Sequence, residues 1–237
     1  MVTVMDTIII AIIGILGVMA YKLRALDGKG TLAAAFLGVF TLELGGIYPF
    51  LALLTFVIFG ILATKYHFSE KIKQGIAQEG KGTRSWRNVF GNGLAALIFL
   101  IIEYHTKQDI FWAATFSAIA TANADTLASE LGKIWGKYPR IITTLEPVSP
   151  GEDGAVSLQG EVAALVGASV IALFALFLIQ NKTEILVAVT LGGFLGCNID
   201  SIIGATLERK GLVNNHHTNF LATLLGGIAG ALIFFLL

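Results

Sequence analysis

The chain is dominated by apolar runs with the character of membrane-spanning segments, and shorter polar stretches separate them. In hydrocarbon, every backbone N–H and C=O group has to be paired within the protein, so each run is expected to form an α-helix. We predict about eight transmembrane helices, over residues 4–21, 31–47, 49–64, 89–103, 110–131, 160–180, 185–205 and 218–237. The predicted fold class is an all-α, polytopic integral membrane bundle, formed as a single membrane domain over residues 1–237.

The composition agrees with this assignment. Of all residues, 55% are hydrophobic and 14% are charged, and the mean hydropathy is +0.78. Soluble domains carry about 25% charged residues. The first apolar run has no basic residues before it, and no small-residue cleavage site stands out after it. We therefore expect a retained first helix and not a cleaved signal.

Basic residues fall almost entirely on one side of the predicted membrane. With the N-terminus outside, fourteen of the sixteen Lys and Arg residues lie in cytoplasmic segments, and only Lys107 and Lys182 lie on the outer side. Cytoplasmic loops of membrane proteins carry such an excess of Lys and Arg. We therefore expect a multi-pass protein of a prokaryotic cell membrane, with its polar site at the cytoplasmic face.

The two longest polar connections also lie on the cytoplasmic side. Residues 65–88 form a basic loop, in which Phe68, Ile72 and Ile76 are four apart and predict a short amphipathic helix on the membrane surface. Residues 132–158 form a loop that contains Gly and Pro. Basic loops alone can serve as topology signals, but loops of this length in a compact protein are usually functional.

Two apolar runs end in the same polar pattern, Asn-x-Asp-[Ser/Thr]. Asp125 and Asp200 each lie fifteen residues past the start of their run, so a helix carries each carboxylate ~22 Å into a hydrocarbon layer ~30 Å thick. An ionised carboxylate there costs at least ~2.5 kcal/mol and normally faces a polar cavity. Hydrogen-bonded packing between helices is the simpler interpretation, but such packing normally uses neutral side chains.

The predicted cytoplasmic rim combines acidic residues with helix ends that favour anions. The helices that run outward begin at this rim, two of them near Asn92 and Asn219, and their free N–H groups attract phosphates. Carboxylate and amide oxygens, without Cys or paired His nearby, favour Mg²⁺ over Zn²⁺. The residues that we expect to come together are Asn123, Asp125, Glu130, Asp153, Glu161, Asn198 and Asp200. This combination is typical of nucleotide or phosphate-ester chemistry.

Four sequence blocks resemble those of a known membrane family. They are Trp86-Arg87-Asn88-Val89-Phe90-Gly91-Asn92-Gly93, Ala122-Asn123-Ala124-Asp125-Thr126-Leu127-Ala128-Ser129-Glu130-Leu131-Gly132, Gly151-Glu152-Asp153-Gly154-Ala155-Val156-Ser157 and Gly196-Cys197-Asn198-Ile199-Asp200-Ser201. The chain is similar, from about Gly28 to Gly227, to the family containing plant phytyl-phosphate kinase and human transmembrane protein 19. The resemblance implies a membrane-embedded, Mg²⁺-dependent phosphotransferase. It would transfer the γ-phosphate of CTP, or of another nucleoside triphosphate, to a phytyl, geranylgeranyl or polyprenyl phosphate.

We assign roles on this basis as hypotheses. Metal ligation, directly or through water, is expected of Asp125, Glu130 and Asp200, supported by Asn123 and Asn198. Catalysis is expected of Asp125, Asp200, Glu130 and Arg87. Nucleotide and phosphate binding is expected of Arg84, Asn88, Asn92, Lys133, Arg140, Asp153, Gly154, Ser157 and Asn219. The expected partners are an isoprenyl phosphate, a nucleoside triphosphate and membrane lipids, with no nucleic acid; association into a homo-oligomer is left open.

Other functions fit parts of the same pattern. A cation-coupled membrane transporter would also place aspartates within helices, but its site belongs near the bilayer midplane, with access from both faces. A CTP-dependent lipid cytidylyltransferase or an isoprenol kinase differs in leaving group or acceptor and not in site composition. Only the family resemblance separates these enzymes from the phosphate kinase.

Overall fold

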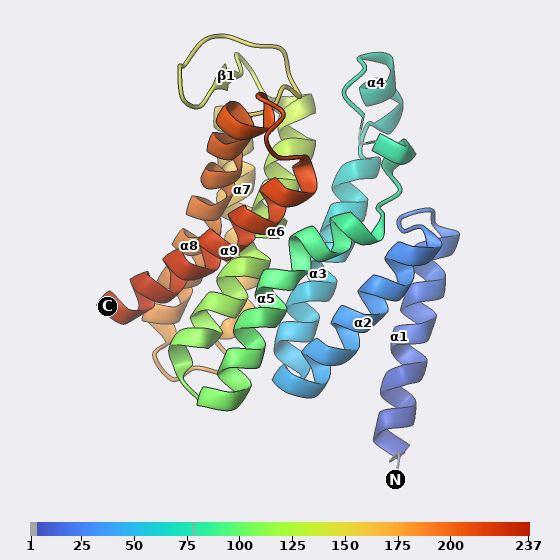
Figure 1. Ribbon diagram of the computed structural model, residues 1–237, viewed down its shortest axis with the longest axis vertical. Coiled ribbons are helices and arrows are strands. Elements are labelled where there is room, and N and C mark those ends of the chain that lie inside the picture. Colours follow the sequence, from blue (N-terminus) through green and yellow to red (C-terminus); the bar gives the residue numbers. More distant parts are fainter. Residues whose placement is uncertain (1–3, 78) are drawn as a thin grey trace.

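The computed structural model describes residues 4–77 and 79–237. In this part of the chain, eight helices of 18 residues or more run between two ends of the molecule (Figure 1). Their bounds are α1 Val4–Lys22, α2 Gly28–Gly45, α3 Ile47–Lys65, α5 Trp86–Thr106, α6 Asp109–Trp135, α7 Leu158–Ala175, α8 Lys182–Ile203 and α9 Asn215–Leu236. The protein is thus an all-α integral membrane bundle.

Five of these helices are long and apolar enough to cross a bilayer: α3, α5, α7, α9, and α8 with its continuation to Glu208. The other three do not meet that test over their described residues, so the number of eight spans stays a prediction. Helix α6 falls short because Asn123, Asp125 and other polar residues interrupt its apolar sequence.

Helix α6 lies at the centre of the bundle and contacts α3, α5, α7, α8 and α9 (Figure 1). Small residues allow its neighbours to approach closely. A Cβ atom added to Gly196 of α8 or to Gly226 of α9 would collide with the Thr121 side chain of α6. Small residues at such crossings are the usual basis of helix packing in membranes.

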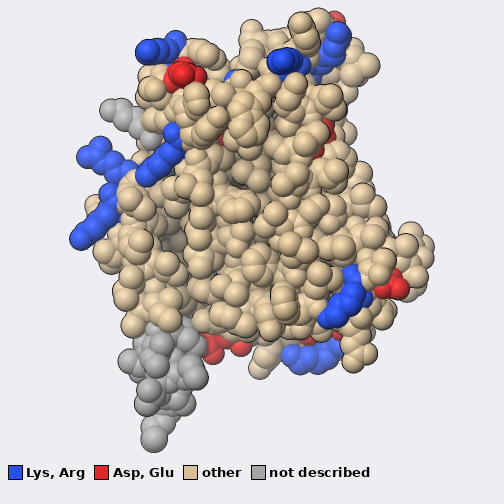
Figure 2. Space-filling view, turned by 180° about the vertical axis from the view of Figure 1, so that it is seen from behind, with Lys and Arg blue, Asp and Glu red and all other residues tan. Residues whose placement is uncertain are grey.

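Charged side chains are distributed unevenly along the bundle. Figure 2 shows a broad uncharged belt on the face that it presents, with charged groups concentrated at one end and fewer at the other. The more highly charged end carries α4 (Phe68–Lys73), the 3₁₀ turn η1 (Glu79–Gly82) and the antiparallel strands β1 (Arg140–Ile141) and β2 (Ala155–Val156). We call it the loop end.

One residue of the short helix α4 does not lie where its pattern predicts. Lys71, predicted on the polar face, is fully buried. The prediction of its position was wrong because Lys71 forms a buried ion pair with a carboxylate of α6. Ile72, predicted on the apolar face, is 55% exposed on the outside of the protein.

Side-chain caps fix the helix starts at the loop end. Ser85 and Asn88 form a capping box at α5, Ser157 accepts a hydrogen bond from Gly160 N at α7, and Asn214 accepts from the first turn of α9. Such caps pair backbone N–H groups that a helix start leaves free. Helix α8 continues beyond Ile203 into a π-helical turn, η2 (Gly204–Glu208).

Candidate functional site

A cavity of about 200 Å³ opens at the loop end, between α5, α6, α7, α8, the start of α9 and the 132–158 loop. Most of the residues predicted for the site line this one cavity, although they come from positions more than a hundred residues apart. They are Arg84, Asn88, Asn92, Asp125, Glu130, Lys133, Asp153, Gly154, Ser157, Glu161, Asp200 and Asn219.

Asp125 of α6 and Asp200 of α8 both line the cavity. The Asp200 Oδ2 atom is buried and has no hydrogen-bond partner among the described residues. A buried carboxylate oxygen without a donor is unfavourable unless a cation compensates it. The pair is therefore suited to bind a positive ion.

The two carboxylates suit a Mg²⁺ ion that binds protein and substrate oxygens together. Among the described residues, no three His, Cys, Asp or Glu side chains are arranged to hold a metal ion by themselves. Mg²⁺ commonly uses one or two carboxylates, together with water and substrate phosphates. Asp125 and Asp200 would supply the protein ligands of such an ion.

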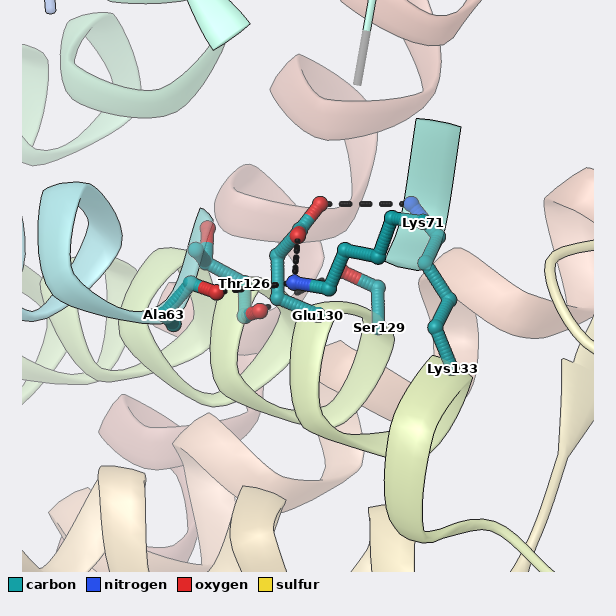
Figure 3. A network of polar contacts seen from close by, with 6 residues as sticks. All are labelled: Ala63, Lys71, Thr126, Ser129, Glu130 and Lys133. Carbon is teal, nitrogen blue, oxygen red and sulfur yellow. Dashed lines mark hydrogen bonds and ion pairs between the residues drawn. The ribbon is translucent and has the colours of Figure 1, made fainter. Parts of the chain in front are cut away.

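Glu130 is engaged by two lysines, one on each carboxylate oxygen (Figure 3). Lys71 Nζ lies 2.6 Å from Glu130 Oε2, and Lys133 Nζ lies 3.2 Å from Oε1. Direct metal binding by Glu130 conflicts with this geometry, because both oxygens already face ammonium groups. Binding through water stays a prediction. Glu130 instead holds Lys133 at the wall of the cavity.

Lys71 also contacts α3. Its Nζ donates to Ala63 O at 2.8 Å (Figure 3), a carbonyl in the last turn of that helix. The last carbonyls of a helix lack intrahelical partners and attract cations. Lys71 therefore ties α4 to both α3 and α6. Lys71 is not among the residues predicted for the site, because nothing in the sequence indicates a partner 59 positions away.

Arg84 precedes α5, and hydrogen bonds fix its backbone to the turn between α1 and α2. Arg84 N donates to Ala25 O at 2.8 Å, and Asp27 N donates to Arg84 O at 3.1 Å. Burial lowers the pKa of the Arg84 guanidinium, while the charges of Glu130 and Asp125 act in the opposite direction. Arginine nevertheless stays protonated, so the cavity contains a fixed positive charge.

The loop that contains Gly151 to Ser157 packs against the end of α8. A Cβ atom on Gly154 would lie 2.6 Å from Ala205 Cα and N, and this glycine has a φ of +75°. Only glycine meets both conditions without strain. The close contact places Asp153 and Ser157 on the cavity wall.

Four predicted residues do not line the cavity. Asn123 is buried and donates to Gly167 O at 2.8 Å, so it joins α6 to α7. Asn198 donates to Glu161 Oε2 at 3.1 Å and so supports another carboxylate. Arg87 is exposed over the ring of Trp86. Arg140 donates to Leu145 O within its own loop.

Comparison with known proteins identifies the family of this chain. The family model described as "Integral membrane protein DUF92" matches residues 11–227. An uncharacterized membrane protein of Methanocaldococcus jannaschii, MJ0933, is 37% identical over 227 residues, which cover 95% of this chain and 92% of that protein. No solved structure matches.

Two plant proteins of Arabidopsis thaliana are also similar. The chloroplastic protein VTE6 is 30% identical over 216 residues, covering 88% of this chain and 65% of VTE6. The protein PGR is 30% identical over 217 residues, covering 81% of this chain and 75% of PGR. The chain thus belongs to the DUF92 family of integral membrane proteins, the family that contains plant phytyl-phosphate kinase.

Proposed function

We propose that this protein is an isoprenyl-phosphate kinase that uses CTP, or another nucleoside triphosphate, as phosphate donor. The observation that carries the proposal is the single cavity in which Asp125 and Asp200 lie together with Arg84 and Lys133. Paired carboxylates suit a divalent cation, and the two cations suit phosphates. Membership of the family makes a lipid monophosphate the expected acceptor.

The reaction joins two anions and requires little covalent participation by the protein. An oxygen of the lipid monophosphate attacks the γ-phosphorus of the nucleotide and forms a new P–O bond. The bond between the γ-phosphorus and its bridging oxygen breaks, and the nucleoside diphosphate leaves with the electron pair. Because the attacking phosphate is already ionised near neutral pH, no general base is needed, and positioning and charge neutralisation dominate.

The residues of the cavity divide these tasks. Lys133, held by Glu130, contacts a phosphate of the donor, and the Gly151–Ser157 turn encloses the nucleotide on the side of η2. Mg²⁺, bound by Asp125 and Asp200, would supply neutralisation of the phosphate charge. Glu161, which accepts a hydrogen bond from Asn198, supplies a further carboxylate that would bind the ion directly or through water. The cavity is expected to open to the cytoplasm.

A label-transfer experiment tests this function. Purified protein in nanodiscs is incubated with Mg²⁺, CTP labelled in the γ-phosphate, and geranylgeranyl or phytyl phosphate. We expect label in the lipid diphosphate and release of CDP. Release of pyrophosphate with cytidine on the lipid would indicate a cytidylyltransferase. No label in any lipid, across all four nucleoside triphosphates, would refute kinase function.

The free isoprenol serves as the matched acceptor control. Its hydroxyl has to lose a proton during attack, so a general base becomes useful. No histidine lines the cavity among the described residues. We therefore expect the alcohol to react far more slowly than the phosphate, and efficient phosphorylation of the alcohol would contradict the assignment of a monophosphate acceptor.

A further inference from the structure

A second, apolar cavity adjoins the polar one. It has a volume of about 70 Å³ and lies between α2, α3 and α5, where Leu37, Leu53, Phe56 and Val57 supply apolar walls. Arg84 and Asn88 line both cavities. An apolar space therefore meets a polar, cation-containing space at these two side chains.

The Arg84 side chain has no fixed anionic partner. Among the described residues, no carboxylate or carbonyl oxygen forms an ion pair or hydrogen bond with its guanidinium, which lies 5.8 Å from the centroid of the Phe56 ring. Lys71 and Lys133, in contrast, are both paired with Glu130. Cations in the interior of a membrane protein normally have partners. Among the described residues, Arg84 is thus a cation beside the cavity that no carboxylate holds in place, whereas Lys133 stays paired with Glu130 while it contacts the donor.

Asn88 adds a second donor at the same junction. Its Oδ1 accepts from Ser85 N and Oγ, both at 3.1 Å. Its side-chain NH₂ group has no hydrogen-bond acceptor among the described residues, and its position is fixed by the capping box of α5. A guanidinium and an amide N–H group at the mouth of an apolar space form a suitable site for an anionic headgroup attached to a hydrocarbon chain.

We propose that the α2–α3–α5 cavity binds the isoprenoid tail of the acceptor next to its phosphate, and that Arg84 and Asn88 bind that phosphate. This inference rests on the proposed kinase function for the identity of the lipid. The cavity is smaller than the ~300–1,000 Å³ of pockets that enclose whole drug-sized ligands. It therefore takes the first part of the tail, and the remainder extends into the bilayer.

The two substrates then bind on different sides of the polar cavity. The acceptor enters from the side of α2, α3 and α5, whereas Lys133 and the Gly151–Ser157 turn lie on the side of α6 and α8. The acceptor phosphate at Arg84 and the donor phosphates at Lys133 thus approach one another across the polar cavity. Roughly opposite approach is what in-line phosphoryl transfer requires.

Photo-crosslinking tests this subsite without any need for turnover. A geranylgeranyl phosphate with a diazirine in its first isoprene unit is added to the protein in nanodiscs without nucleotide, and the labelled peptides are mapped by mass spectrometry. We expect label on α2, α3 or α5 at the walls of the cavity. Unlabelled geranylgeranyl phosphate should compete for the site more strongly than geranylgeraniol.

Two alanines on α2 provide a matched pair of variants. Ala34 lines the apolar cavity and Ala35 does not. Ala34→Leu fills the space and should reduce crosslinking about tenfold, as expected for the loss of room in an apolar pocket. Ala35→Leu adds the same side chain elsewhere and should have little effect. Equal crosslinking in both variants, or label mapped to α8 and α9 in the wild type, would overturn the proposal.

Arg84 supplies an independent test, in case Ala34→Leu does not fold. Arg84→Gln should weaken competition by the lipid phosphate about 10-fold to 100-fold, because a charge-assisted hydrogen bond is lost. Arg84→Lys should recover part of that loss. Unchanged competition in Arg84→Gln would refute phosphate binding by this residue.

Failure of this inference is distinguishable from failure of the proposed function. Label at the cavity walls without diphosphate formation by any nucleotide would refute the kinase and leave the lipid subsite standing. Diphosphate formation with label elsewhere would refute the subsite and leave the kinase standing.

Discussion

Replacing Lys71 by methionine should release α4 from the body of the protein. The Lys71 ammonium and the Glu130 carboxylate are 0% and 2% exposed, and Nζ lies 2.6 Å from Oε2. Methionine preserves much of the volume of the side chain but removes its charge. The change leaves one Glu130 oxygen and the carbonyl of Ala63 without the Nζ donor.

The free-energy cost of losing the Lys71 charge follows from the geometry of the ion pair. Removing one partner of a buried ion pair costs about 3–5 kcal/mol. The lower end applies here, because Lys133 stays 3.2 Å from the other oxygen of Glu130 and offsets part of its charge. At about 1.4 kcal/mol per factor of ten, a loss of about 3 kcal/mol raises the equilibrium for local opening roughly 100-fold.

Hydrogen exchange measured by mass spectrometry is the direct assay. Backbone amides of Gln74 and Gly75 donate to Glu70 and Ile72, so their exchange reports opening of α4. We expect faster exchange over residues 68–76 in Lys71→Met, and a return toward wild type in the double variant Lys71→Met/Glu130→Gln.

The exposed Lys73 of the same helix provides the control. Lys73→Met removes the same charge from α4 without breaking a described ion pair, and should leave exchange unchanged. If Lys71→Met and Lys73→Met exchanged at the same rate, the buried pair would not hold α4 in place.

Three further predictions concern the polar cavity. Asp200→Asn should lower turnover at least about 100-fold, since it removes one of the two carboxylates proposed to bind Mg²⁺, while size-exclusion profiles stay unchanged. Near-normal kcat at saturating Mg²⁺ would exclude a ligand role. Lys133→Ala should raise the KM for the nucleotide several-fold. Arg140→Ala should not raise it, because the Arg140 side chain is bound within its own loop. Equal effects of the two variants in steady-state kinetics would contradict a phosphate-binding role for Lys133 alone. Gly154→Ala should lower the free energy of unfolding by about 2–3 kcal/mol in thermal unfolding, because strain at φ +75° adds to a backbone collision. Gly211→Ala, with φ +69° but open space around the new Cβ atom, should lower it by only about 1 kcal/mol. Similar losses in the two variants would show that the collision at Gly154 is relieved.

The sequence predicts the same depth for the two aspartates, because each lies fifteen residues past the start of its apolar run. In the structure both line one cavity. The direction of the asparagine side chains could not be predicted in the same way. Asn123 lies two residues before Asp125, about 200° around the helix axis, and its amide binds Gly167 of α7 instead of facing the cavity.

The ion pair between Lys71 and Glu130 could not be predicted from the sequence either. Lys71 lies between Glu70 and Lys73 in a polar segment, a pattern that is typical of a solvent-exposed helix face. Its burial depends on the position of Glu130 in a helix formed by a distant part of the chain. Arg140 shows the opposite error: it lies in the loop that forms one wall of the cavity, but its side chain is used by the local turn at Leu145.

The central position of α6 has a consequence for how the protein is made. This helix carries Asp125, yet it is too polar to count among the helices able to cross a bilayer on length and composition. A translocon sorting segments by hydrophobicity would release it into lipid poorly on its own. We therefore expect stable insertion to depend on the helices that cover its surface, α3 and α5, synthesised before it, and α7 to α9, synthesised after it. The residues that give the cavity its polarity would thus couple membrane insertion of α6 to its packing against these five helices.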